Sequence, residues 1–121
     1  MSVAALFLVL AQMCIIFFFS SLTLDTIASW GITLGQYSYL AHVALYAGLG
    51  SLLYLMLLKM NVFLRLGYVW TLGFCFALAD EVHQKYVPGR TFSVDDVKLD
   101  MLGIAVGIAV VALLLRLKDR R

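Results

Sequence analysis

Acidic, basic and imidazole side chains gather between residues 80 and 100, and their types could support acid–base chemistry or the binding of an anion. Asp80, Glu81 and His83 are close in sequence, so a carboxylate could orient a histidine that acts as a general base. Arg90 could bind a phosphate or a carboxylate through its planar guanidinium group. The proline and glycine of the segment 87–90 predict a tight turn that fixes the position of this arginine.

Apolar helices must position these side chains, because 64% of the 121 residues are hydrophobic and only 13% are charged. A soluble domain is closer to half apolar and a quarter charged. A membrane-spanning helix needs about 20 apolar residues, and four stretches qualify, at about residues 3–22, 37–58, 62–79 and 99–115. The sequence therefore predicts an all-α membrane protein, with one domain (1–121) that forms a bundle of four transmembrane helices. The fourth helix is predicted to be short and to sit with little tilt.

The distribution of positive charge predicts that both termini are cytoplasmic. With four spans, the N-terminus, the connection after the second span and the C-terminus share one side of the membrane. That side holds six Lys and Arg residues, and the opposite side holds three. Under the positive-inside rule, the side richer in Lys and Arg faces the cytoplasm. The connections after the first and third spans then face outward.

This topology brings the unusual polar residues to the outward side of the membrane. Ionisable groups within or beside a span are costly unless they face the bundle interior or a wet cavity. Their convergence therefore predicts a functional site. The predicted ligand-binding residues are Ser20, Ser21, His42, Tyr46, Asp80, Glu81, His83, Gln84, Arg90, Asp96 and Asp100.

Helical spacing predicts that three of the spans turn these polar residues toward one another. In the fourth span, Asp96, Asp100, Gly103 and Gly107 are separated by four, three and four residues and so share one stripe. The two glycines form a G-x-x-x-G motif, which allows helix backbones to approach closely in lipid. Comparable stripes are predicted for Gly73, Ala77, Asp80 and Gln84 in the third span and for Tyr39, His42 and Tyr46 in the second.

Several of these residues also have a purely structural interpretation. Ser93 and Asp96 fit a capping box at the start of the fourth span, and Asp100 could be an anion favoured by the helix dipole. His42 could simply be hydrogen-bonded by a neighbour. Arg90 could pair with the nearby carboxylates and neutralise them instead of binding a ligand. The aromatic residues Trp30, Tyr37 and Tyr39 are interpreted as interfacial anchors.

The segment from Asp80 to Gly103 resembles the signature of the VanZ-like family of bacterial membrane proteins. Its motifs D-E-x-H-Q and P-G-R, and the aspartate and glycine that follow them, are matched by Asp80, Glu81, His83, Gln84, Pro88, Gly89, Arg90, Asp96 and Gly103. Two earlier motifs resemble Phe19-Ser20-Ser21 and the pair His42 and Tyr46. Two positions depart from the family pattern, because Tyr39 stands where a lysine is usual and Asp100 where an asparagine is usual.

The resemblance implies a role in the bacterial cell envelope, a location in the cytoplasmic membrane and a link to teicoplanin-type antibiotic resistance. It implies no agreed biochemical activity. Combined with the outward-facing polar residues, it leads us to expect a protein that binds an anionic lipid-linked or glycopeptide-related ligand. The lipid bilayer is the expected partner and nucleic acid is not, while the cofactor and the oligomeric state stay open.

The alternative interpretation is a membrane-embedded enzyme that acts on an envelope lipid or precursor. Its candidate catalytic residues are His42, Asp80, Glu81 and His83. Histidines and carboxylates could also bind a divalent metal in such an enzyme. Their spacing matches no zinc signature, so the sequence predicts no set of metal ligands. A transporter is a third class, but four spans would need to oligomerise to enclose a pathway.

Overall fold

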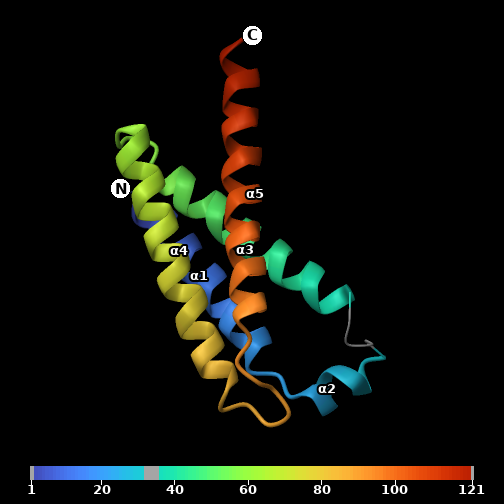
Figure 1. Ribbon diagram of the computed structural model, residues 1–121. Helices are drawn as coiled ribbons and strands as arrows, with labels where there is room; N and C mark the ends of the chain where they lie inside the picture. The colour runs from blue at the N-terminus through green and yellow to red at the C-terminus, as the bar shows by residue number, and fades with distance from the viewer. Residues whose placement is uncertain (1, 32–35, 121) are drawn as a thin grey trace.

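The computed structural model describes residues 2–31 and 36–120, with the backbone alone described for residues 36–38. The anchor role predicted for Tyr37 therefore lies outside the described side chains. Its helices are α1 (Val3–Ser20), α2 (Leu24–Ser29), α3 (Gln36–Met56), α4 (Val62–Gln84) and α5 (Val94–Asp119). In this part of the chain, α1, α3, α4 and α5 are long and apolar enough to cross a membrane. The predicted class, an all-helical protein with four helices able to span a membrane, is confirmed (Figure 1).

The helices extend beyond the apolar stretches that identified them. α4 continues through Asp80 to Gln84, and α5 begins at Val94 because the side chain of Ser93 caps it by accepting from the Asp96 N–H at 3.2 Å. With 26 residues and a rise of about 1.5 Å per residue, α5 is about 39 Å long. The prediction of a short fourth helix is therefore wrong, since polar residues at both of its ends continue the helix.

The short helix α2 follows α1 and was not predicted. Thr23 begins it, and its hydroxyl accepts from the backbone N–H of Thr26 at 3.3 Å. α2 lies at the end of the bundle where α4 turns into α5, away from the C-terminus (Figure 1). α2 thus lies beside the end of the bundle where the long helices place their polar groups.

The glycine stripe of α5 lies directly against α3. A Cβ atom added to Gly103 would lie 2.6 Å from the carbonyl oxygen of Val43, and one added to Gly107 would overlap the carbonyl oxygen of Ala47. Gly50 of α3 is equally close to the backbone of Ile104. The predicted close approach through G-x-x-x-G is thus confirmed, and it brings Asp100, one turn before Gly103, into the bundle interior.

The outward faces of the long helices are covered by large apolar side chains. Phe7, Phe63 and Leu113 are among the most exposed of them. Such surfaces are unfavourable in water and suited to lipid tails. The bundle also contains an interhelical hydrogen bond of the kind found in membrane proteins. The side-chain amide of Gln12, in the middle of α1, donates to the carbonyl oxygen of Leu45 in α3 at 2.9 Å.

Candidate functional site

Three of the predicted site residues meet around the carboxylate of a fourth, Asp80, which is 1% exposed. Its Oδ2 atom accepts from the hydroxyl of Ser20 at 2.6 Å, from that of Tyr46 at 3.4 Å and from the amide nitrogen of Gln84 at 3.3 Å. These donors come from α1, α3 and α4. Asp80 therefore links three helices at one end of the bundle. Gly73, Ala77, Asp80 and Gln84 are all buried, as their predicted stripe requires.

Arg90 joins this group through Gln84. Its Nε and one terminal nitrogen donate to the Gln84 Oε1 atom at 3.0 and 2.7 Å. The ion pairs formed among the described residues are His42–Asp100 and Lys98–Asp95. The alternative prediction, that Arg90 neutralises a nearby carboxylate, is therefore wrong. Gln84 engages two of the five N–H donors that a guanidinium carries.

The turn before Arg90 has the predicted geometry. The Arg90 N–H donates to the carbonyl oxygen of Val87 at 3.1 Å, and Gly89 adopts a φ of +80°. This is the left-handed conformation that glycine provides at the third position of a type II turn. A Cβ atom at Gly89 would also lie 3.3 Å from the side chain of Leu24 in α2, so the turn packs on that helix.

A second buried group, which we call the buried triad, consists of His42, Glu81 and Asp100. The Nδ1 atom of His42 lies 2.8 Å from Oδ1 of Asp100. Glu81 accepts the backbone N–H of Ser93 at 3.0 Å through its Oε2 atom. One nitrogen or oxygen from each member lies within 4.8 Å of the others. The triad joins α3, α4 and α5, whereas the Asp80 group joins α1, α3 and α4.

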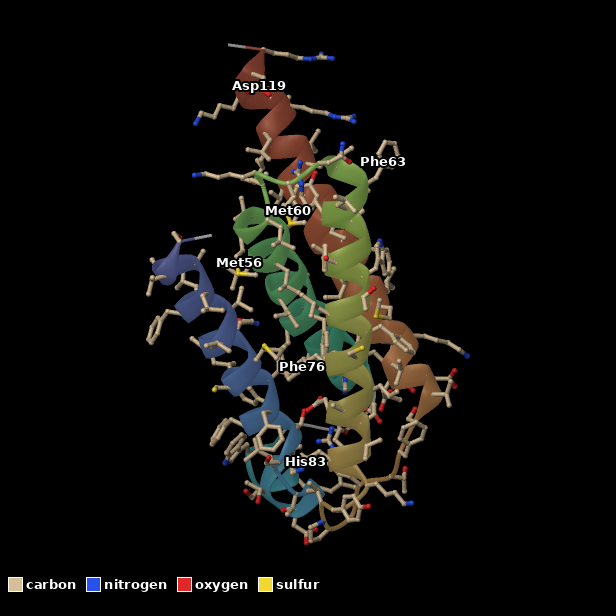
Figure 2. The ribbon with its side chains drawn as sticks, turned by 90° about the vertical axis from the view of Figure 1, so that its left-hand side faces the viewer. Met56, Met60, Phe63, Phe76, His83 and Asp119 are labelled. Atoms are coloured by element: carbon tan, nitrogen blue, oxygen red, sulfur yellow. The ribbon has the colours of Figure 1, made fainter. Side chains whose placement is uncertain are left out.

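His83 and Ser21 lie apart from both buried groups. The Nε2 atom of His83 is 3.0 Å from the exposed hydroxyl of Ser21, and its ring stacks on Phe17 with 4.2 Å between ring centroids. Figure 2 shows His83 at the end of α4, on the side that faces α1. The structure thus places this pair at the helix surface, and its role in binding or catalysis stays a prediction.

Two further predictions need correction. Ser93 caps α5 as predicted, since its hydroxyl accepts the Asp96 N–H. In a capping box, the Asp96 carboxylate would in turn accept the Ser93 N–H. That N–H donates to Glu81 instead, so the predicted capping box does not form. Asp96 is partly exposed in the first turn of α5. Tyr39 does not share the buried face of His42 and Tyr46, because it is 53% exposed, which suits its other interpretation as an interfacial anchor.

A cavity of about 390 Å³ opens between α1, α2 and α3 beside the Asp80 group. Its polar lining consists of Ser20, His42, Tyr46, Asp80 and Arg90, and its apolar lining is Ile16, Phe19, Leu22, Ile27, Trp30, Ala41, Ala44 and Leu45. The sequence did not identify the apolar residues of the cavity, because residues of the same types also occupy lipid-facing positions of membrane helices. The one available signal was Thr23, which caps the N-terminus of α2.

Comparison with known proteins identifies a family for this chain. The model of the VanZ/LLP1 family matches residues 5–116, which is nearly the whole chain and includes both buried groups. The chain matches no curated protein and no solved structure.

Proposed function

The chain belongs to the VanZ/LLP1 family, and from that premise we propose that it binds an amphiphile with an anionic head group in the cavity between α1, α2 and α3. Family membership together with four helices able to span a membrane fits a membrane protein linked to teicoplanin resistance. We further propose that the ligand in this cavity is a lipid-linked or glycopeptide-related molecule of the cell envelope.

The observation that carries the proposal is the lining of the cavity. Aliphatic and aromatic side chains such as Ile16 and Leu45 form most of it, while Arg90, His42 and Asp80 lie at its polar part. A small-molecule site is typically concave and mostly apolar with a few polar groups that fix orientation. An acyl or prenyl chain suits the apolar lining. The guanidinium donors of Arg90 that Gln84 does not engage suit a phosphate or a carboxylate.

Asp80 adds a second requirement for the head group. Its Oδ2 atom accepts several hydrogen bonds, but within the described part of the chain its buried Oδ1 atom has no hydrogen-bond partner. Because Asp80 also lines the cavity, a ligand that supplies a hydroxyl or amide donor would satisfy this oxygen. A head group that combines an anion with sugar hydroxyls or peptide amides meets both requirements, as a lipid-linked cell-wall precursor does.

Filling the cavity tests the proposal. Ala44 lines the cavity, and Ala79 of α4 is an exposed alanine outside the cavity lining. We expect the Ala44→Phe protein to retain several-fold less bound envelope lipid than the wild type, because the phenyl ring occupies the space that the chain of the lipid would use. Native mass spectrometry after mild detergent extraction would measure the bound lipid. The matched variant Ala79→Phe should retain as much lipid as the wild type, and equal retention by both variants would contradict the proposal.

An enzymatic role is favoured by one observation. His42 lines the cavity while its Nδ1 atom is paired with Asp100, and a carboxylate that orients a histidine is a common arrangement for a general base. If the protein is an enzyme, incubation with a lipid-linked precursor should give a modified product, and His42→Gln should bind the precursor without converting it. Binding without conversion by the wild type supports the binding function alone.

The orientation that the proposal requires has its own test. We expect the polar end of the bundle to face outward and both termini to be cytoplasmic, because the positive charges concentrate at the opposite end. Lys85 follows α4 at the polar end, whereas Lys118 lies in the last turn of α5. In a variant without Cys14 and Cys75, a cysteine replacing Lys85 should react with an impermeant thiol reagent added to intact cells, and one replacing Lys118 should not. The reverse pattern would place the cavity at the cytoplasmic side.

A further inference from the structure

The buried triad combines three side chains that metal ions bind, each from a different helix. One potential ligand atom of His42, of Glu81 and of Asp100 lies within 4.8 Å of the other two. Glu81 and Asp100 are fully buried, and His42 is 8% exposed. Ligand atoms around a zinc ion lie about 3 to 3.5 Å apart, since each bond is about 2.0–2.2 Å long and the bonds meet at tetrahedral angles. Small side-chain rotations would therefore close the triad around one ion.

In each of the two carboxylates, one oxygen has a hydrogen-bond partner and the other has none among the described residues. Glu81 Oε2 is held by the Ser93 N–H, and Asp100 Oδ1 by His42. Within the described residues, the second oxygen of each carboxylate, Glu81 Oε1 and Asp100 Oδ2, is buried without a hydrogen-bond partner. A buried oxygen in this state is costly and calls for a bound ion or water. Glu81 is thus positioned by one oxygen and able to coordinate through the other, whereas Asp100 and the Nδ1 atom of His42 would exchange their mutual contact for bonds to the ion.

The charges of the triad also match a divalent cation. Two buried carboxylates are expensive unless a positive charge compensates them. Arg90 donates to Gln84 instead, and the ion pair that reaches the triad within the described chain is the internal one between His42 and Asp100. Two carboxylates and a neutral imidazole around a divalent cation give a net charge of zero. A proton on His42 would compensate only one of the two carboxylates.

We propose that His42, Glu81 and Asp100 bind a divalent transition-metal ion, with Zn²⁺ preferred. One imidazole nitrogen and two carboxylate oxygens form a donor set that suits Zn²⁺ or Mn²⁺, and Zn²⁺ is bound more tightly than Mn²⁺ by most such sites. Ca²⁺ favours oxygen ligands alone and should bind more weakly. Three protein ligands leave a fourth tetrahedral position for water or a ligand oxygen. The site adjoins the lipid cavity through His42, but the proposal rests on the triad and not on lipid binding.

Metal analysis of the full chain tests the proposal. The protein would be purified through a tag that contains no histidine, stripped with EDTA, equilibrated with Zn²⁺, Mn²⁺ or Ca²⁺ in separate samples, and analysed by plasma mass spectrometry. We expect about one Zn²⁺ per wild-type chain, less Mn²⁺ and the least Ca²⁺. Zn²⁺ should also raise the Tm of the wild type by several degrees, because it binds the folded state preferentially. This shift is measured without any variant.

Matched variants assign the ion to the triad. Glu81→Gln and Asp100→Asn keep the shape of each side chain and remove a negative charge, so each should bind at least tenfold less Zn²⁺. Asp95→Asn, at an exposed residue of α5 that pairs with Lys98, should bind as the wild type does. The proposal is overturned if stripped wild-type protein takes up no Zn²⁺ and shows no change of Tm. It is equally overturned if the double variant of Glu81 and Asp100 binds as much Zn²⁺ as the wild type.

Discussion

Gly107→Leu is expected to destabilise the folded bundle by about 3 kcal/mol or more, because a side chain at this position must enter space held by backbone. A Cβ atom at Gly107 would overlap the carbonyl oxygen of Ala47 and lie 2.8 Å from the backbone nitrogen of Ser51. Helix backbone cannot move aside as a flexible side chain can. α3 and α5 share the most extensive interface of the bundle, so their separation would also disperse the buried triad.

Gly67 provides the matched control for this substitution. It lies in α4, is exposed, and a Cβ atom added there would meet nothing within 4 Å. Gly67→Leu should therefore leave the free energy of unfolding unchanged or raise it slightly, since leucine favours helix more than glycine does. Unfolding of both variants by SDS in mixed micelles would compare them. Equal stability of Gly107→Leu and Gly67→Leu would mean that α3 and α5 do not pack through their backbones.

Arg90→Lys is expected to weaken the binding of an anionic lipid tenfold to a hundredfold while the protein stays folded. Lysine keeps the positive charge but loses the planar fork, so it cannot donate two parallel hydrogen bonds to an oxyanion as arginine can. The loss of one charge-assisted hydrogen bond, at about 1.5–3 kcal/mol, accounts for an effect of this size. The free energy of unfolding should fall by only about 1 kcal/mol, because a lysine amine can still donate to Gln84 Oε1.

The lipids and the control variant make this prediction specific. Phosphatidylglycerol carries the phosphate that Arg90 is proposed to bind, and diacylglycerol with the same chains lacks it. Arg90→Lys should change the Kd of phosphatidylglycerol alone, and Arg116→Lys, near the exposed end of α5, should change neither Kd. Cells that depend on the protein for an envelope phenotype should lose that phenotype with Arg90→Lys. Undiminished binding and phenotype would leave Arg90 with a structural role only.

The features that could be predicted from the sequence are those that depend on one helix at a time. Hydropathy located the four spans, and the spacing of Asp100, Gly103 and Gly107 predicted the face of α5 that packs inward. The turn before Arg90 followed from Pro88 and Gly89. Each of these predictions uses local geometry, in which a residue and its neighbours three or four positions away determine the result.

The features that could not be predicted depend on which helix lies opposite. Glu81, His83 and Gln84 are neighbours in sequence, yet they face α5, α1 and the Asp80 group respectively, because each position turns a helix by about 100°. Gln84 was expected to bind ligand, and its role as the acceptor for Arg90 appears only in three dimensions. α2 has six residues, too few for a periodic pattern, so the cavity that it helps to form was not visible in the sequence.

The most direct test of the proposed function is to locate a bound lipid by nuclear magnetic resonance. The protein would be prepared in deuterated detergent with protonated short-chain phosphatidylglycerol. We predict intermolecular Overhauser contacts from the lipid chain to the methyl groups of Ile16 and Leu45, together with a shift of the Arg90 Nε–H resonance that diacylglycerol does not cause. Contacts confined to exposed methyl groups such as those of Leu72 and Leu113, with an unchanged Arg90 signal, would contradict the proposal that this cavity binds an anionic lipid.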